Sequence, residues 1–525
     1  MDHTIQYGTA AAGVISILAV YLALRRRSTV RNIPGPVSPS WLFGNMLQLY
    51  LPSTYGDYEF DWQRIYGPFY RIKGCFGQDK LMISDPVSLQ YILNSPHFKF
   101  GPTVENAIHV LYGTDSIMGV NEEDHKRIRA ALNVGYTAAA VRDYIPVFEK
   151  AAQTLTEQLE ESSGKSINIC PRLSLATLST ISEVVMGYST TELGEEFIKN
   201  NFQACNLRSA IASSQSAGQI VADAIGARLP GWVWRAAIHL PTATCKAIRT
   251  AKRLANELGN QVLREKREAA EQGLDINTDL YGQLLDLHLL DKTKNTLTEA
   301  EIVAQTAITM IAGQDTTANT LTFGLVELAK SPEFQDRLRA EIHSTLRASD
   351  GGSVSYDNMP LLNAFIKESL RMFPAEAVTD RVAVEDVVIP LTDNLITTTG
   401  ERISHIPVSK GQIVTLAIAS YQRLESRWGE DAQEFKPSRW LDGPTFKGEA
   451  VGPYANLLSF LGGPRVCLGW RFAIMEMQVF VCELVGKFAF TLSEGDSTRP
   501  RLASSLLPTM SDGQKGALIC AKRVM

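Results

Sequence analysis

The chain has 525 residues, a net charge of −5 and a pI near 6.0. This near-balanced charge argues against a nucleic-acid binder, which usually carries a basic domain. Its seven cysteines are scattered and form no C-x-x-C pair, which argues against a zinc module or a disulfide framework and indicates a reducing compartment.

The first segment has the properties of a membrane anchor. No charged residue occurs from Thr4 to Leu24, a run of 21 residues, and about 20 apolar residues suffice for a helix to cross the hydrocarbon core. Arg25, Arg26 and Arg27 follow at once, and the positive-inside rule places them and the rest of the chain in the cytosol. A cleaved signal peptide is the minor alternative, because it would carry its charges before the apolar run. We therefore expect a single N-terminal transmembrane helix.

The sequence changes character at Ile33-Pro34-Gly35-Pro36, where the prolines block helix continuation and favour a stiff spacer. Beyond it the pattern is mostly helical, with amphipathic runs over 141–160 and 244–271 and short strand-like pieces over 69–73 and 80–83. Strands and helices do not alternate regularly, which disfavours a parallel-sheet α/β fold. We therefore divide the chain into a membrane anchor (1–28), a proline-containing hinge (29–50) and one catalytic domain (51–525).

One long helix is predicted from Thr298, where Thr298-x-x-Glu301 matches a capping box, to Ser331-Pro332. About 30 residues would form a rod of roughly 45 Å. The middle of this helix has the sequence AGQDTT, at 312–317. Its glycine and threonines weaken a helix. Asp315 and Thr316 at this point suggest a proton-handling site, although a polar exposed face explains them equally well.

A single cysteine lies in the stretch FLGGPRVCLG, from Phe460 to Gly469. The apolar spacing that follows predicts a helix over 468–488. Cys467 would therefore precede a helix N-terminus, whose N–H groups and dipole favour an anion such as a thiolate. A buried structural cysteine is the alternative.

Four motifs occur in a fixed order along the chain. They are A-G-x-D-T-T, then E-x-x-R at Glu368 and Arg371, then F-x-P-x-R-W with Arg439, and finally F-x-x-G-x-R-x-C-x-G. This ordered set resembles the cytochrome P-450 superfamily of heme-thiolate monooxygenases, microsomal type, and most closely its fungal members. The resemblance extends from the anchor to the C-terminus and is strongest over 298–488. It implies the cytochrome P-450 fold, mainly α with small β-sheets, after a single transmembrane helix.

The resemblance implies heme b, iron protoporphyrin IX, as the cofactor and Cys467 as the axial thiolate ligand of its iron. Gly463 and Gly469 would let the backbone pass close beneath the porphyrin, and Phe460 would shield that face. N–H groups after Cys467 would hydrogen-bond the sulfur. On the distal side, Thr316 would hydrogen-bond the bound oxygen and Asp315 would help bring protons from water.

The heme propionates are anions and require cationic partners, for which arginine is well suited. The candidates are Arg465, Arg381 and Arg129, together with His125, which stands where the family often has tryptophan.

The resemblance also implies a buried charge network of Glu368, Arg371 and Arg439 with a structural role. Ser438 replaces the glutamate of the family's usual P-E-R, and we expect no consequence because the arginine is the network member.

The segments expected to line the substrate pocket are rich in apolar residues, which suggests an apolar substrate, although an ordinary core has the same composition. They are 100–118, 206–230, 307–312, 375–379 and 504–509. Trp232 and Trp234, within 229–240, mark either a second membrane contact or a packed internal helix.

The leading function is a heme-dependent monooxygenase that inserts one oxygen atom of O2 into a lipophilic small molecule, such as a terpenoid or another secondary metabolite. Its electrons would come from NADPH through a separate NADPH-cytochrome P-450 reductase, with cytochrome b5 as a further partner, because no flavin or nicotinamide fingerprint occurs. The expected location is the endoplasmic reticulum membrane, with the catalytic domain cytosolic. The alternatives are a reductase-independent heme-thiolate isomerase or dehydratase, whose members often lack the acid–threonine pair, and a non-enzymatic heme carrier.

Overall fold

The computed structural model describes residues 28–200, 216–290, 296–349, 352, 354–441, 450–493, 495, 497–503 and 505–524. The predicted anchor over 1–28 therefore lies outside the described residues, apart from its last position. The described part is mainly helical with small sheets, as the sequence predicts.

Long helices form most of the molecule. They are α4 (Pro86–Asn94), α5 (Pro102–Tyr112), α6 (Glu122–Leu132), α8 (Ile145–Glu160), α9 (Ile169–Met186), α12 (Ala217–Gly226), α14 (Ala243–Glu271), α15 (Leu280–Leu290), α17 (Thr306–Ala329), α18 (Pro332–Ala348), α19 (Pro360–Met372) and α22 (Trp470–Lys487). Shorter helices connect them: α2 (Met46–Tyr50), α3 (Glu59–Tyr66), α7 (Ala138–Asp143), α10 (Thr190–Leu193), α13 (Gly231–Ala237), α16 (Glu299–Ala304), α20 (Ile418–Tyr421), α21 (Glu425–Trp428), and the 3-10 turns η1 (Cys75–Gly77), η2 (Asn133–Tyr136), η3 (Tyr356–Asn358), η4 (Pro437–Trp440) and η5 (Gly463–Arg465).

Within the described residues, the strands form four small sheets. Their bounds are β1 (Phe69–Lys73), β2 (Asp79–Ile83), β3 (Phe98–Phe100), β4 (Ser166–Asn168), β5 (Val378–Ala383), β6 (Val387–Ile396), β7 (Arg402–Val408), β8 (Ile413–Ala417), β9 (Phe488–Leu492), β10 (Arg499–Leu502), β11 (Leu506–Thr509) and β12 (Leu518–Arg523). The largest sheet has the order β1-β2-β8-β5-β3, in which β2 and β8 are parallel. The others are β4-β12-β9 and the antiparallel pairs β6-β7 and β10-β11.

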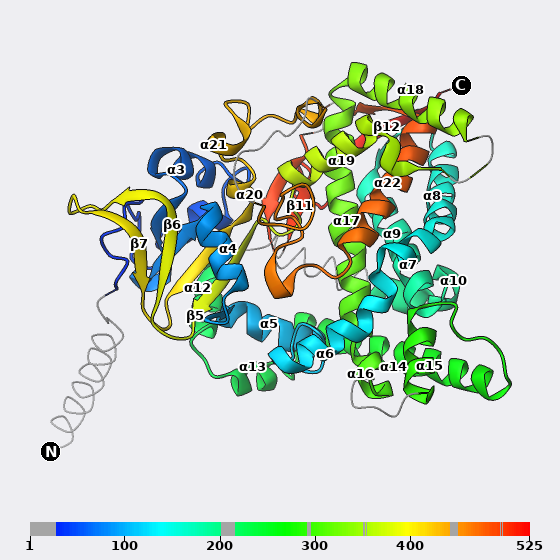
Figure 1. Ribbon diagram of the computed structural model, residues 1–525, viewed down its shortest axis with the longest axis horizontal. Coiled ribbons are helices and arrows are strands. Elements are labelled where there is room, and N and C mark those ends of the chain that lie inside the picture. Colours follow the sequence, from blue (N-terminus) through cyan, green and yellow to red (C-terminus); the bar gives the residue numbers. More distant parts are fainter. Residues whose placement is uncertain are drawn as a thin grey trace.

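Helix α17 forms the centre of the helical part and packs along α9, with α14, α19 and α22 also in contact (Figure 1). The close packing of α17 on α9 depends on Gly313, because a Cβ atom there would lie 2.6 Å from the side chain of Ile181. The helix continues unbroken through Gly313, so this glycine permits close helix packing and does not interrupt the helix. Helix α9 is long and apolar enough to span a membrane, but 72% of that stretch is buried within the protein, as expected for a core helix.

Two predicted helices are each divided in the structure. The single helix predicted from 298 is wrong, because α16 and α17 are separated at Gln305, whose side chain bonds the backbone of Asp115 and Ile117. The capping box at its start is confirmed. The run 141–160 divides into α7 and α8 because Pro146 occupies the first turn of α8, a position that suits proline whereas a helix interior does not.

Candidate active site

The loop that carries Cys467 is tightly held by its own backbone and by α4. The Cys467 amide donates a hydrogen bond to the Phe460 carbonyl at 2.9 Å. Gly463 has a φ of +67°, and a Cβ atom there would overlap the carbonyl oxygen of Leu93 in α4. Glycine is therefore required at this position for two independent reasons, its backbone conformation and the close approach of α4. Gly469 meets no such constraint from protein atoms, since a Cβ atom there would touch only the Tyr136 ring at 3.7 Å.

The Cys467 side chain is exposed, yet the surrounding protein acts on its thiol. The side chain is accessible to solvent, although burial in the surrounding protein raises the pKa of its thiol. Both observations hold together if the thiol faces a recess enclosed by protein. A hydrogen bond from the Gly469 amide and the charge of Arg129 act in the opposite direction and lower this pKa. The sulfur therefore has a donor and a cation available for its thiolate form, just before α22.

Four cationic or titratable side chains gather beside this loop from three different parts of the chain. Arg129 and His125 come from α6, Arg465 from η5 and Arg381 from β5. The Arg381 and Arg465 guanidinium groups lie 4.6 Å and 5.8 Å from the centroid of the Phe100 ring. His125 is buried, and burial together with Arg465 and Arg129 lowers the pKa of His125 to about 4. The imidazole is therefore neutral at pH 7 and adds no positive charge.

None of the three arginines forms an ion pair with a carboxylate in the part of the chain that the structure describes, although Glu122 acts on Arg465 and Glu376 acts on Arg381 electrostatically. Burial lowers the pKa of each of them. Asp380, the neighbour of Arg381, pairs instead with Lys80 at 2.8 Å and accepts from Thr415 at 2.6 Å. A partly buried group of cations without a paired carboxylate is costly unless an anion binds there. The Cys467 sulfur and these three arginines together fit heme. The iron of heme binds a thiolate, and its anionic propionates pair with arginine side chains.

The two predicted distal residues on α17 lie in different surroundings. Thr316 is half-buried and donates its Oγ1 hydrogen to the Ala312 carbonyl at 2.8 Å, and Ala312 is exposed although it lies within a core helix. Asp315 is buried and directed toward other elements. Its Oδ1 accepts from Ser174 Oγ of α9 at 3.0 Å and pairs with Lys515 Nζ at 2.9 Å. Thr316 therefore belongs to an open face of α17, whereas Asp315 is held by an ion pair.

The three residues of the predicted charge network are joined in the structure. The Arg371 guanidinium meets the Glu368 carboxylate through two bonds of 2.8 Å and 2.9 Å, and Arg439 Nε reaches the same carboxylate at 3.0 Å. Arg371 also donates to the carbonyls of Gln422, Ala432 and Glu434. This network therefore fixes the segment between β8 and η4 to α19.

Sequence reasoning did not identify Lys515 or Glu476, which lie near the distal residues. Glu476 on α22 is fully buried and accepts hydrogen bonds from Thr180 and Thr317. Burial raises the pKa of Glu476 to about 8. Neither residue belongs to a local pattern that indicates a partner on α17, because both contacts arise only when distant segments pack together.

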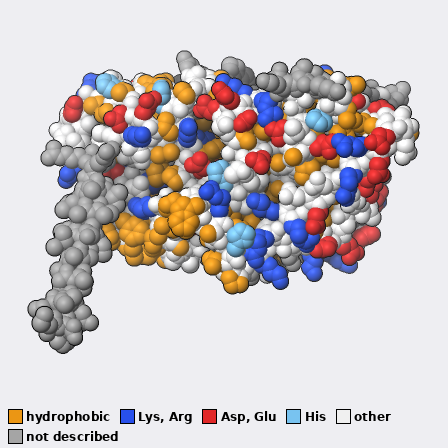
Figure 2. Space-filling model, turned by 90° about the horizontal axis from the view of Figure 1, so that it is seen from below, with side chains coloured by type: hydrophobic (Ala, Val, Ile, Leu, Met, Phe, Trp, Pro, Cys, Tyr) orange, Lys and Arg blue, Asp and Glu red, His pale blue; other side chains and the backbone are white. Residues whose placement is uncertain are grey.

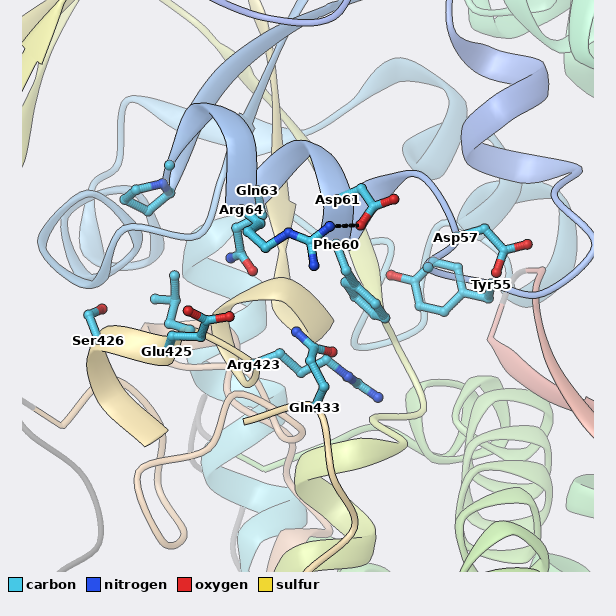
Figure 3. Close-up of a pocket in the computed structure, with 14 residues that line it drawn as sticks. Tyr55, Asp57, Phe60, Asp61, Gln63, Arg64, Arg423, Glu425, Ser426 and Gln433 are labelled. Carbon is cyan, nitrogen blue, oxygen red and sulfur yellow. Dashed lines mark hydrogen bonds and ion pairs between the residues drawn. The ribbon is translucent and has the colours of Figure 1, made fainter. Parts of the chain in front are cut away.

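A separate pocket of about 430 Å³ lies between the segment 55–68, which includes α3, and the segment 423–433, which includes α21 (Figure 3). Arg423 and Phe60 stack within it at 4.6 Å, and the Asp61 and Arg64 side chains pair on its wall. It shares no lining residue with the site around Cys467, so we do not assign the predicted chemistry to it.

Comparisons with known proteins agree with this geometry. The family model "Cytochrome P-450" matches residues 34–515. Cytochrome P-450 monooxygenase 219 of Postia placenta is 30% identical over 511 residues, covering 92% of each chain. Cytochrome P-450 monooxygenase claP of Ampulloclitocybe clavipes is 29% identical over 509 residues, covering 94% of this chain and 93% of that protein. With the cysteine loop and the arginine group already in place, these matches show that the chain belongs to the cytochrome P-450 family and is a heme-thiolate monooxygenase.

Proposed function

We propose that this monooxygenase inserts one oxygen atom of O2 into a lipophilic small molecule, such as a terpenoid or another secondary metabolite, with electrons from NADPH through a separate reductase. The observation that carries the proposal is the accessible Cys467 sulfur beside three arginines that form no ion pair with a carboxylate among the described residues. The sulfur supports binding of an electrophilic metal centre, and the arginines support binding of anionic groups at the edge of the same cofactor.

Cys467 would hold the heme iron, and Arg129, Arg381 and Arg465 would hold the propionates. When bound, the heme supplies the oxygen-activating iron, to which the thiolate donates electron density. The Gly469 amide donates to the sulfur and thereby tunes its donor strength. The neutral His125 imidazole lies among the same arginines and would offer the propionates a hydrogen bond but no charge.

Thr316 and Asp315 would have different roles in proton transfer. The Thr316 hydroxyl is on the open face of α17 and can donate a hydrogen bond into the recess once it turns from the Ala312 carbonyl. Asp315 is one residue away and holds its carboxylate next to Ser174 Oγ. In the proposed relay, protons from water pass by way of Asp315 to the Thr316 hydroxyl, where they are needed to complete oxygen reduction.

Attachment to the endoplasmic reticulum membrane, with the catalytic domain on the cytosolic side, is part of the proposal. Among the described residues, Val37, Trp41, Leu229 and Trp232 are exposed hydrophobic side chains. Helix α13 lies at the lower edge of Figure 1, the side viewed in Figure 2, which shows a cluster of hydrophobic side chains. Trp234 does not contribute, because it packs on Gly226 and donates to its carbonyl at 2.9 Å. An exposed surface of this kind supports contact with a lipid headgroup layer.

The proposal is tested by co-expressing the full chain with an NADPH-cytochrome P-450 reductase and supplying the membranes with a library of apolar compounds, with and without cytochrome b5. The expected result is a product heavier by one oxygen atom, labelled when ¹⁸O2 is supplied, and formed only with NADPH and reductase. A product that forms without NADPH would instead support the isomerase or dehydratase chemistry.

A further inference from the structure

Lys515 reaches the middle of α17 from a turn near the C-terminus of the chain. Its Nζ lies 2.9 Å from Asp315 Oδ1, and only 13% of the Lys515 side chain and 9% of the Asp315 side chain are exposed. Asp315 Oδ1 also accepts from Ser174 Oγ at 3.0 Å. One carboxylate oxygen therefore receives both a cation and a hydroxyl, which fixes the orientation of the carboxylate.

The turn that carries Lys515 is itself held in place. Asn168, the N-cap of α9, donates from Nδ2 to the Lys515 carbonyl at 3.2 Å and accepts from the Ala517 amide at 3.2 Å. Gly516 has a φ of +147°, and a Cβ atom there would overlap the Asn168 side chain. The Lys515 backbone is thus fixed against α9, so its side chain is directed by the fold and does not depend on a chance surface contact.

The same segment continues from the hairpin β10-β11. The Leu506 amide donates to the Ala375 carbonyl at 2.7 Å, and the Leu506 carbonyl accepts from Asn319 on α17 at 3.4 Å. Positions 375 and 506 both belong to segments that the sequence predicts to line the substrate pocket. The Lys515 turn is therefore connected through β11 to this predicted lining.

We propose that Lys515 is the positioning residue of the proton relay, holding the Asp315 carboxylate in a fixed orientation one residue from Thr316. This inference rests on the proton relay of the proposed function, and it adds Lys515 as the residue that orients Asp315. The ammonium group makes the charged form of Asp315 tolerable in a buried position, because a buried carboxylate without a cation is strongly disfavoured. Without Lys515, Asp315 Oδ1 would keep only the hydrogen bond from Ser174 Oγ, and its orientation would no longer be fixed.

The test compares K515M, K515R, D315N and the double variant K515M/D315N in the full-length enzyme with its reductase. The matched control is K522M, the same substitution at an exposed lysine seven residues further along. We expect D315N to slow product formation by about 10²-fold, the lower end for a positioned proton-transfer group. K515M should slow it by about 10-fold, K515R should restore most of the rate, and K515M/D315N should be no slower than D315N.

A second readout needs no turnover. Infrared difference spectra of the resting enzyme against D315N isolate the carboxylate stretch of Asp315, which should be a sharp band in the unmodified protein and in K522M and should shift and broaden in K515M. A rate for K515M equal to that of K522M, or a double variant slower by the product of both single effects, would overturn the role of Lys515. If D315N itself keeps the full rate, the proposed relay fails, whatever K515M does.

Discussion

At the residue scale, neighbouring positions on α17 have different surroundings. Thr316 lies on the half-open face beside the exposed Ala312, whereas Asp315 is buried in an ion pair. Residues one position apart on a helix point about 100° apart, so this division follows directly from helix geometry. This division supports a role for the Thr316 hydroxyl at the open face of α17 and for the Asp315 carboxylate on the buried side of the same helix.

Thr316→Ala is expected to separate oxygen activation from substrate binding. The substitution removes a hydroxyl and little volume, so the spectral change on substrate addition should persist. Product per NADPH oxidised should fall while hydrogen peroxide rises, because protons are no longer delivered correctly. The control is Thr322→Ala, which removes another hydroxyl that donates to a carbonyl four residues earlier, but from a fully buried position. Full coupling in Thr316→Ala would contradict the relay.

Glu368→Gln is expected to destabilise the fold by about 3–5 kcal/mol in the free energy of unfolding, because it leaves the buried Arg371 without its anion and Arg439 with only the partly exposed Asp431. Burial alone would raise the pKa of Glu368, but Arg371 and Arg439 outweigh it and lower that pKa. The stabilisation is thus complete above the unfolded-state pKa of about 4.3 and is lost as the pH falls through the lower folded-state value.

Denaturant unfolding at several pH values measures this difference. The gap between Glu368→Gln and the unmodified protein should shrink in acid. Asp431→Asn is the control, because Asp431 meets Arg439 at a partly exposed position, where an ion pair contributes little. A gap that stays constant down to acidic pH would show that charge is not the cause.

At the element scale, the loop around η5 has its shape fixed by the fold. We expect Gly463→Ala to reduce the heme bound per chain and to lower the thermal midpoint, because the new Cβ atom would meet the Leu93 carbonyl oxygen. Gly411→Ala is the control, since Gly411 has a φ of +85° and no atom within 4 Å of a Cβ position. It should lose only about 1–2 kcal/mol from backbone strain and keep its heme. Equal heme loss in both variants would refute the role of the contact with α4.

Elements with strong local signals were predicted well from the sequence, and those set by distant contacts were not. The strand pieces at 69–73 and 80–83 and the helix at 244–271 agree with β1, β2 and α14 to within a residue. The break at Gln305 was missed because it depends on hydrogen bonds to Asp115 and Ile117, nearly 190 residues away in the chain. The break before α8 was predictable, because Pro146 marks it.

At the scale of the whole molecule, the candidate site is assembled from residues that no local pattern connects. The motifs identify Cys467, Arg371 and Asp315 one by one, but only the fold brings Arg129 and Arg381 close to Arg465. In the same way, the partner of Asp315 comes from a turn two hundred residues further along the chain. A single sequence carries no signal for such pairs, because each lysine or arginine alone resembles an ordinary surface residue.

Deletion of residues 1–28 is expected to release much of the protein from membranes while it keeps its heme, since the site residues all lie downstream. Any remaining membrane binding should fall further with Trp232→Ser, because Trp232 is 63% exposed. Leu290→Ser, at another highly exposed apolar residue, should not change it. Flotation of each variant with lipid vesicles gives the measurement, and equal losses for the two substitutions would argue against a specific contact.

The central claim is that Cys467 provides the thiolate to the heme iron, and its most direct test is the spectrum of the reduced protein under carbon monoxide. The unmodified chain should show the red-shifted Soret band of a thiolate-ligated heme. Cys467→Ala should lack this band, whereas Cys482→Ala, at a buried cysteine on α22, should keep it. A Cys467→Ala protein that retained the red-shifted band would contradict the assignment.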